Sequence, residues 1–296
     1  MIQDTALPGL LLRFEDFPST GLFRMWNWKI DPWRTTQPAE KTEDMVVISG
    51  WKSGDHHHVN EQLSVLSSER TGFFERRVYR LPDKGTLWDF VRVSGERLQL
   101  RFWVNAEWNQ VNLLADNTGT QGMAAFEYLA QMMPGIHLNH DVLTFHASLV
   151  EYAGWAFAVC ASSGTGKTTH ARLWRDYKNA IILNGDRMIC DCQQQTWMAY
   201  GSPWSGTSGE QINRSAPLKA LVVLERGEQN EATHITGLEA FGAILPHILY
   251  PSWDIELTGK ALELLDKFLS EIPAVRLRCR PDTESVDVLC RFLEEL

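Results

Sequence analysis

The sequence contains no long hydrophobic run. No apolar segment approaches the roughly 18 residues that a membrane-spanning helix requires. The first residues, MIQDTALPGL, have neither the basic region nor the apolar region of a secretory signal peptide. Both features argue against membrane-spanning and secreted proteins, so the sequence predicts a cytoplasmic protein without a membrane partner.

A basic stripe is also lacking. The formal net charge is −9, and acidic and basic residues are mixed along the chain. Proteins that bind nucleic acids usually concentrate Lys and Arg on one face or in one segment. The sequence therefore does not predict a nucleic-acid partner.

Cysteine is scarce, and its count is odd. A chain of 296 residues does not need disulfides to stabilise its core, so reduced thiols are expected at Cys160, Cys190, Cys192, Cys279 and Cys290. Cys190 and Cys192 would share one face of a strand, where a metal ion could bind. No second Cys or His pair stands at ligand spacing, which favours a structural role.

What the sequence does contain is typical of globular domains, with 44% hydrophobic and 22% charged residues. The length suits one large domain or two ordinary ones. Tryptophan is frequent, and seven of the 12 residues precede position 110: Trp26, Trp28, Trp33, Trp51, Trp88, Trp103 and Trp108. This favours a sheet core filled by large aromatic side chains, with a ligand-stacking surface as the alternative.

The hydrophobic period changes at about residue 121. Before it, short alternating runs separated by Gly, Pro and Asp predict strands at 45–51, 73–81, 88–95 and 97–104. Over 121–135 the spacing is helical, and Pro134-Gly135 is expected to end that helix. We therefore expect a β-rich N-terminal domain at 1–120 and a second domain at 121–296.

The second half alternates strand and helix patterns. Strands are predicted at 142–152 and 155–161, joined by a tight turn at Ala153-Gly154, and at 180–186, 218–227 and 274–280. Helices are predicted at 167–177, 238–249, 259–272 and 283–296. Strand, glycine-rich loop, helix, strand and acid in that order is typical of an α/β nucleotide-binding domain.

The strand at 155–160 runs directly into ASSGTGKT (161–168), which has the spacing of a P-loop (Walker A) with Ala161 at the first glycine position. Glycines there let the backbone approach phosphate closely, and consecutive N–H groups at a helix N-terminus attract an anion. Lys167 would reach the β- and γ-phosphates of ATP, and the Thr168 hydroxyl would ligate Mg²⁺. The predicted nucleotide-binding residues are Ser162, Ser163, Gly164, Thr165, Gly166, Lys167, Thr168 and Thr169. A glycine-rich turn without a ligand is the alternative.

A nucleotide site of this kind also needs an acid that orients Mg²⁺ or accepts the proton of the attacking hydroxyl. Asp186 follows an apolar run and stands 19 residues after Lys167, which places it on a neighbouring strand. It is the predicted metal ligand and catalytic acid. The alternative is an Asp in a strand-end turn, a position that Gly185-Asp186 also suits.

FHASLVEYAGWAFAVCASSGTGKTTHA resembles the core of the HPr kinase/phosphorylase family and of its smaller serine-kinase-like relatives. In those kinases a His precedes a short hairpin and the phosphate loop, and His146 stands 21 residues before Lys167. SGTGKTT is also similar to the phosphate loop of ATP-dependent phosphoenolpyruvate carboxykinases, which share that fold. The resemblance covers about 121–296 and implies a P-loop-containing α/β core.

Three further segments, ILNGDR, YGSPWSG and PLKALVVLERGE, are similar to a bacterial branch of HPr-kinase-like proteins. Some members of that branch phosphorylate a serine on a precursor peptide. The sequence departs from HPr kinases in having Gly185-Asp186 where they carry two adjacent acids. It also lacks their acid–Arg-Gly signature and the second metal motif of the carboxykinases, which argues against HPr docking, phosphorolysis and decarboxylation.

Several other polar residues could take part. The resemblance implies that His146 polarises a phosphate or supports the acid, whereas a core histidine is the alternative. Glu210 and Arg214 lie in a Gly- and Ser-rich segment (201–214) that could form a lid. These two residues could then bind Mg²⁺ or contact phosphate. A solvated surface loop is the alternative. Arg226 could reach phosphate or be a hairpin charge. The DHHH run at 55–58 is predicted to be a polar loop and not a metal site.

The favoured function is an ATP-dependent kinase that phosphorylates a hydroxyl, either a peptide serine or a small alcohol. Asp186, helped by His146, would accept the hydroxyl proton, and the N-terminal domain would recognise the acceptor. Because only one acid is present, a nucleotide-binding partner protein without catalysis is the main alternative. An NTPase that drives a conformational change is a third. ATP, GTP and pyrophosphate all remain open as the donor, and the resemblance to hexameric HPr kinases suggests a homo-oligomer.

Overall fold

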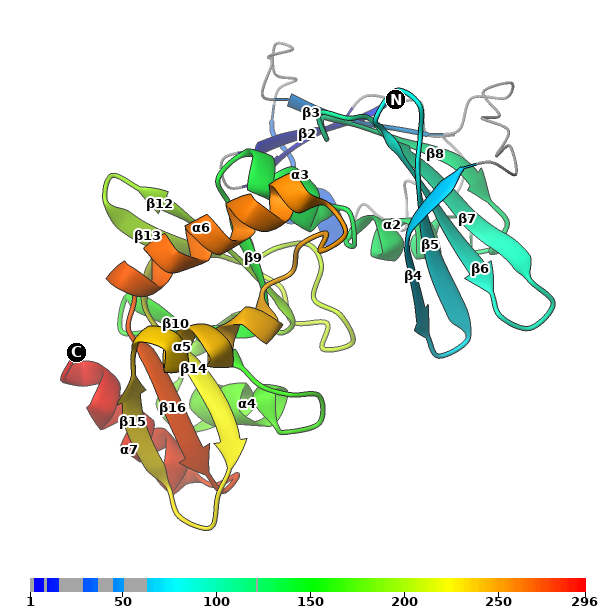
Figure 1. Ribbon diagram of the computed structural model, residues 1–296. Coiled ribbons are helices and arrows are strands. Elements are labelled where there is room, and N and C mark those ends of the chain that lie inside the picture. Colours follow the sequence, from blue (N-terminus) through cyan, green and yellow to red (C-terminus); the bar gives the residue numbers. More distant parts are fainter. Residues whose placement is uncertain (1–2, 8–9, 16–28, 37–44, 51–62, 121) are drawn as a thin grey trace. The chain divides into compact units, whose positions relative to one another are not determined.

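A computed structural model shows that the protein has a mixed α/β fold made of two compact units, Met1–Asn139 and His140–Leu296 (Figure 1). It describes residues 3–7, 10–15, 29–36, 45–50, 63–120 and 122–296. The first unit ends after two helices that the sequence-based division at residue 120 assigned to the second domain. None of the helices in these described ranges is long and apolar enough to cross a membrane.

The first unit is built on one large sheet. Its strands lie in the order β1-β2-β3-β8-β7-β6-β5-β4, and all neighbours are antiparallel except the pairs β2–β3 and β3–β8. The strands are β1 (Gln3–Leu7), β2 (Leu10–Glu15), β3 (Met45–Ser49), β4 (Ser64–Thr71), β5 (Phe74–Arg80), β6 (Thr86–Arg92), β7 (Arg97–Val104) and β8 (Gln110–Asp116). The predicted strands at 45–51, 73–81, 88–95 and 97–104 thus correspond to β3, β5, β6 and β7.

Large aromatic side chains fill the core of this unit. Trp33, Trp88 and Trp108 are buried, and the rings of Trp88 and Trp108 meet edge to face at 6.1 Å between centroids. Edge-to-face packing adds favourable electrostatics to the burial of apolar area. These three tryptophans support the core interpretation, whereas Trp103 is only partly buried. Trp26, Trp28, Trp51 and the DHHH run lie outside the described residues.

Two short helices follow the sheet: α2 (Met123–Leu129) and α3 (Met133–Asn139). The prediction that Pro134-Gly135 ends a helix is wrong, because both residues lie in the first turn of α3. Proline is tolerated there since the first-turn N–H groups have no partner within the helix. Gly135 packs against Trp108, whose ring atoms lie within 2.6 Å of where a Cβ would stand.

The second unit is organised around strands β9 and β14, which each run through two neighbouring sheets. One sheet holds β11, β9, β10, β14, β16 and β15. In the other, the order is β9, β12, β13 and the start of β14. In the first sheet, β10, β14 and β16 are parallel. The strands are β9 (Leu143–Tyr152), β10 (Trp155–Cys160), β11 (Ile181–Asn184), β12 (Arg187–Gln193), β13 (Thr196–Tyr200), β14 (Ser215–Arg226), β15 (Glu231–Ile235) and β16 (Ala274–Cys279).

Helices cover both faces of these strands (Figure 1). They are α4 (Lys167–Lys178), α5 (Gly237–Ile244), the 3₁₀ turn η2 (Leu245–His247), α6 (Ile255–Glu271) and α7 (Thr283–Glu294). On one face, Trp174 of α4 packs on Phe157 of β10 at 4.6 Å between centroids. On the other, Phe268 of α6 packs on Phe145 of β9 at 5.3 Å. The unit is therefore a three-layer α/β arrangement with an aromatic core on each side.

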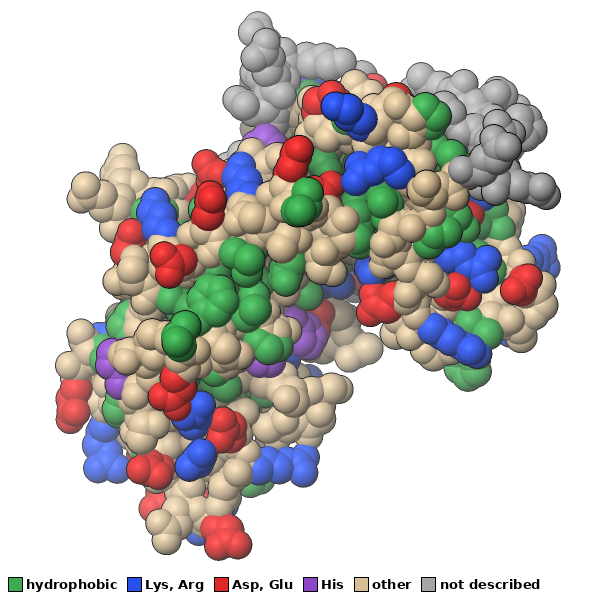
Figure 2. Space-filling view, viewed as in Figure 1, with side chains coloured by type: hydrophobic (Ala, Val, Ile, Leu, Met, Phe, Trp, Pro, Cys, Tyr) green, Lys and Arg blue, Asp and Glu red, His purple; other side chains and the backbone are tan. Residues whose placement is uncertain are grey.

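The surface of the second unit mixes apolar and charged side chains. Figure 2 shows hydrophobic side chains gathered between α5 and α6, with basic and acidic side chains interspersed around them. Leu238 and Ile255, in the first turns of α5 and α6, are 91% and 87% exposed. All five cysteines are unpaired thiols, and Cys160 and Cys190 are completely buried.

Candidate active site

The glycine-rich loop lies between the centre of the sheet and a helix. β10 ends at Cys160, α4 begins at Lys167, and the intervening loop takes left-handed conformations at Gly164 (φ 75°) and Gly166 (φ 124°). No side chain caps the N-terminus of α4, so its first N–H groups lack the usual intramolecular acceptor. Those N–H groups and the helix dipole are suited to bind an anion.

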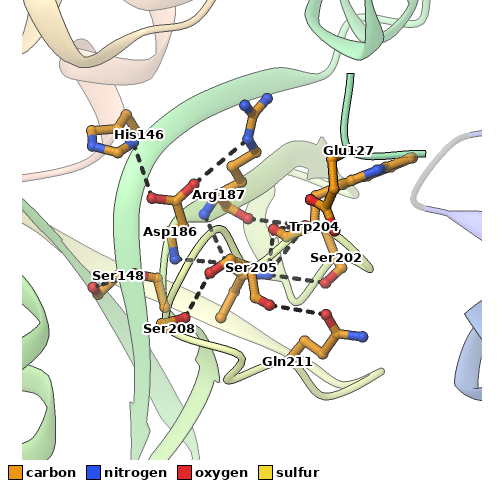
Figure 3. Close-up of polar contacts among 12 residues, drawn as sticks. Glu127, His146, Ser148, Asp186, Arg187, Ser202, Trp204, Ser205, Ser208 and Gln211 are labelled. Carbon is orange, nitrogen blue, oxygen red and sulfur yellow. Dashed lines mark hydrogen bonds and ion pairs between the residues drawn. The ribbon is translucent and has the colours of Figure 1, made fainter. Parts of the chain in front are cut away.

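Three of the predicted functional side chains meet beside this loop. The Lys167 Nζ atom lies 2.9 Å from His146 Nε2, and His146 Nδ1 lies 3.4 Å from Asp186 Oδ1. Strand pairing explains the meeting, because Ala147 is opposite Cys160 in the β9–β10 ladder and His146 is opposite Arg187 in the β9–β12 ladder. Figure 3 shows His146 and Arg187 on either side of the Asp186 carboxylate.

Chemistry fixes the proton positions in this trio. A lysine ammonium can only donate, so His146 Nε2 must accept and the neutral ring carries its proton on Nδ1, facing Asp186. Burial, and then the charge of Lys167, lower the pKa of His146. Burial also lowers the pKa of Lys167, against the opposing effect of Asp186. A partly desolvated ammonium of this kind interacts strongly with an incoming phosphate.

A second histidine that the sequence analysis did not single out lies close to the trio. His247 belongs to η2, and the adjoining Ile248 and Leu249 pair with Phe145 and Thr144 of β9. Its pKa is lowered by burial and then by the electrostatic influence of the nearby His146 and Lys167. The sequence placed His247 in a continuous helical pattern, so nothing there connected it to the site.

A buried asparagine holds the turn that carries Asp186. Asn184 is completely buried, and its Oδ1 accepts the backbone N–H groups of Asp186 at 2.8 Å and Arg187 at 2.7 Å. Its Nδ2 donates to the carbonyl oxygens of Ser202 at 3.0 Å and Trp204 at 3.2 Å, and lies 3.1 Å from the Ser202 hydroxyl. Asn184 therefore links the Asp186 turn to the 201–214 segment.

The 201–214 segment packs directly over Asp186. A Cβ on Gly206 would lie 2.7 Å from Asp186 Cγ, and Gly206 has a φ of 56°. Both facts require glycine at this position. The hydroxyls of the two nearby serines are used internally, Ser205 with Gln211 and Ser208 with the Ser205 carbonyl (Figure 3). The segment is thus an ordered loop, fixed over the carboxylate by its own hydrogen bonds.

The two charged residues predicted in this segment point to other partners. The Glu210 carboxylate lies 3.0 Å from Arg175 and 3.4 Å from Arg172, both on α4. Arg214 forms an ion pair with Glu151, five residues along β9 from His146. Five residues of strand correspond to about 17 Å. The structure therefore uses Glu210 and Arg214 to hold the segment against α4 and β9, and the ion pair with Glu151 keeps Arg214 apart from the trio. The Glu210 Oε2 atom lies 3.5 Å from where a Cβ on Gly185 would stand, so Glu210 does lie beside the turn that carries Asp186.

Arg226, at the end of β14, lies against the glycine-rich loop. Its Nη2 donates to the Gly164 carbonyl at 2.6 Å, and its Nε is 3.5 Å from the Thr165 carbonyl. The loop backbone is therefore fixed from the β14 side by a guanidinium group. Within the described parts of the chain, no group of three or more His, Cys, Asp or Glu side chains forms a metal cage.

Comparisons with known proteins add little to this description. No protein-family model matches the chain, and no curated protein matches it. Among solved structures, the chain is similar to the Hpr(Ser) kinase/phosphatase from Coxiella burnetii, with a TM-score of 0.33 and 10% sequence identity. That similarity covers 51% of this chain and 96% of the other. It supports no functional conclusion at this level, so function has to be inferred from the chain's own residues.

Proposed function

We propose that the second unit is an ATP-dependent, Mg²⁺-dependent kinase that transfers a phosphoryl group to a hydroxyl. The observation that carries this proposal is the alignment of Lys167, His146 and Asp186 at the N-terminus of α4. A phosphate-binding cation and a carboxylate that could accept a proton meet there, beside an anion-binding loop. That combination supplies the positioning and charge neutralisation on which phosphoryl transfer depends.

Each residue has a definite task in this proposal. The loop N–H groups over 162–169 and the Lys167 ammonium bind the β- and γ-phosphates of ATP. Thr168 and Asp186 hold Mg²⁺, which commonly takes only one or two protein ligands because substrate phosphates and water complete its coordination. That preference fits a site that has one carboxylate and no cage. Mg²⁺ would neutralise the phosphate charge.

The proton of the acceptor hydroxyl would go to an oxygen of Asp186. His146, neutral and with Nδ1–H facing Asp186, would keep that carboxylate in place and at the same time hold Lys167 until phosphate arrives. The 201–214 segment, fixed over Asp186 by Asn184, would exclude water and shape the acceptor side. The first unit would recognise the acceptor, a peptide serine or a small alcohol. A cytoplasmic location and a homo-oligomeric state stay predictions.

One observation favours a second candidate, nucleotide binding without catalysis. Asp186 is the only carboxylate in the trio, and Arg187 Nε lies 3.6 Å from its Oδ2. An ion pair with Arg187 would occupy the carboxylate oxygen that the kinase mechanism assigns to the acceptor hydroxyl. In this candidate the protein would bind nucleotide and act through a protein partner.

Phosphoryl transfer from γ-labelled ATP with Mg²⁺ to a cell extract and to serine peptides tests both candidates. We expect label on a discrete acceptor, lost by at least about a thousandfold in Lys167→Ala and in Asp186→Asn. Lys178→Ala, at the other end of α4, is the matched control and should keep activity. Full transfer by Lys167→Ala would disprove the kinase mechanism. Nucleotide binding without any label or free phosphate would favour the second candidate.

A further inference from the structure

Strand pairing places His247 beside the trio. Ile248 pairs antiparallel with Phe145 of β9. The Leu249 N–H donates to the Thr144 carbonyl at 2.8 Å, which continues the same register. One residue in the other direction, His247 is directly opposite the histidine of the trio on β9. Directly opposed residues in an antiparallel pair have Cβ atoms about 5 Å apart, so the two histidines are neighbours.

The alternation of side chains along β9 determines the face of the sheet on which His247 lies. Phe145 points to the α6 layer, where its ring packs on Phe268 at 5.3 Å between centroids. His146, the next residue, points to the opposite face and there contacts Lys167 of α4. Because directly opposed residues share a face, His247 lies with His146 on the side of the glycine-rich loop.

The segment that carries His247 and strand β10 occupy the same edge of β9, one after the other. β10 pairs with 147–152 and ends at Cys160, where the chain leaves the sheet to form the loop. Ile248 pairs with Phe145 just beyond that point. The opposite edge of β9 is taken by β11 and β12. His247 therefore lies where the glycine-rich loop leaves the sheet.

Electrostatics agree with this placement. Burial lowers the pKa of His247, and His146 and Lys167 lower it further, which requires that the ring lie close to both residues. Within the described parts of the chain, the His247 ring forms no hydrogen bond or ion pair, and it is partly exposed. A neutral imidazole has one N–H donor, so His247 has a donor available for a ligand.

A phosphate bound at Lys167 would have different neighbours on its two sides. The turn that carries Asp186 joins β11 to β12 and lies toward their edge of β9, whereas His247 lies toward the edge next to the loop. The acceptor hydroxyl would approach from the Asp186 side, which leaves His247 on the other. Donors that are fixed in advance around the phosphoryl oxygens stabilise their charge during transfer.

We propose that His247 is a catalytic residue that donates a hydrogen bond from its ring to the γ-phosphoryl group of the bound nucleotide, on the side away from Asp186. The proposal rests on the phosphate-binding function proposed above. It adds a residue of η2 to a site otherwise built from β9, the loop, α4 and the turn after β11. It also gives the site a means of distinguishing ATP from ADP, which lacks the group that His247 would contact.

Calorimetric titration of the full chain with β,γ-imido-ATP and with ADP, both with Mg²⁺, tests this contact. We expect His247→Ala to weaken binding of the triphosphate at least about tenfold, as the loss of a hydrogen bond to a charged group does, and to leave ADP binding within twofold. His234→Ala, at an exposed histidine of β15, is the control and should change neither. Equal weakening of both ligands, or no weakening of triphosphate binding, would overturn the proposal. A wild-type protein that binds neither ligand would refute the phosphate site itself.

Two more variants separate the loss of a donor from the loss of structure. His247→Gln keeps an N–H donor, and His247→Leu fills a similar volume without one. We expect the Gln variant to bind the triphosphate within about threefold of wild type and the Leu variant to lose as much affinity as His247→Ala, which it replaces if that protein does not fold. In transfer from labelled ATP, His247→Leu should lower kcat at least about tenfold. Equal triphosphate binding by the Gln and Leu variants, or a wild-type kcat in the Leu variant, would contradict the proposed contact.

Discussion

Replacing Asn184 with alanine should both destabilise the second unit and displace Asp186. The substitution removes the acceptor of the Asp186 and Arg187 N–H groups and the donor to the Ser202 and Trp204 carbonyls. The Asn184 Oδ1 atom accepts two hydrogen bonds, and its Nδ2 group can donate only two at a time although three acceptors lie nearby. About four hydrogen bonds are therefore lost. Because Asn184 is completely buried, those backbone groups lose their partners where water has poor access.

At about 0.5–1.5 kcal/mol for each hydrogen bond, the loss amounts to about 2–6 kcal/mol of unfolding free energy. For a unit of this size, a loss of 3 kcal/mol lowers Tm by about 6–12 °C. Ser202→Ala removes a hydroxyl that contacts Asn184 and the Arg187 and Trp204 carbonyls, and because it leaves the Asn184 bonds to the Asp186 turn in place it should cost less, about 1–2 kcal/mol. Urea unfolding measures both values. An Asn184→Ala protein within 1 kcal/mol of wild type, with phosphoryl transfer unchanged, would refute the role assigned to Asn184.

Two other changes have definite expected outcomes. Gly206→Ala places a Cβ 2.7 Å from Asp186 Cγ at a residue with a positive φ. Phosphoryl transfer from labelled ATP should therefore fall at least about tenfold, and the free energy of unfolding should fall by about 1–2 kcal/mol. Unchanged transfer would contradict the packing of the 201–214 segment over Asp186. Burial lowers the pKa of His170 from 6.5 to about 4, so between those pH values the unfolded chain binds a proton that the folded chain does not. Stability is therefore full above about pH 6.5 and falls by about 3 kcal/mol as the pH drops toward 4. Urea unfolding at pH 7.5 and 4.5 should show that the free energy of unfolding depends less on pH in His170→Gln than in wild type. His234→Gln, at an exposed histidine, is the control and should behave as wild type. Equal pH dependence in all three proteins would contradict the role assigned to His170.

Local patterns were enough to find most elements of the second unit. The turn at Ala153-Gly154, for example, has φ values of 52° and 86°, the left-handed pair that a two-residue hairpin favours. The strand, loop and helix order also led to Lys167 and Asp186, and the resemblance to HPr kinases led to His146. The fold does bring these three residues together. These elements could be predicted because hydrophobic periodicity and turn-forming residues are properties of short stretches of sequence.

The features that the sequence did not reveal depend on contacts between distant segments. Asn184 bonds to Ser202 and Trp204, 18 and 20 residues later. The chain between them gives no sign that the two segments meet. His247 reaches the site because the residues after it pair with β9, a hundred positions earlier. Gly135 likewise packs against Trp108, a contact that the local pattern over 121–135 does not show.

The path of β14 through both sheets has a consequence for how the second unit loses its structure. Its first residues pair with β13, and its later residues pair with β10 and β16. Neither sheet can open without disturbing a strand that the other shares. Amide hydrogens at 221–223, which lie between β10 and β16, should therefore exchange with solvent only through global unfolding. The loop beside them is thus attached to the slowest-exchanging part of the unit, and nucleotide binding should protect that loop without altering exchange in β14.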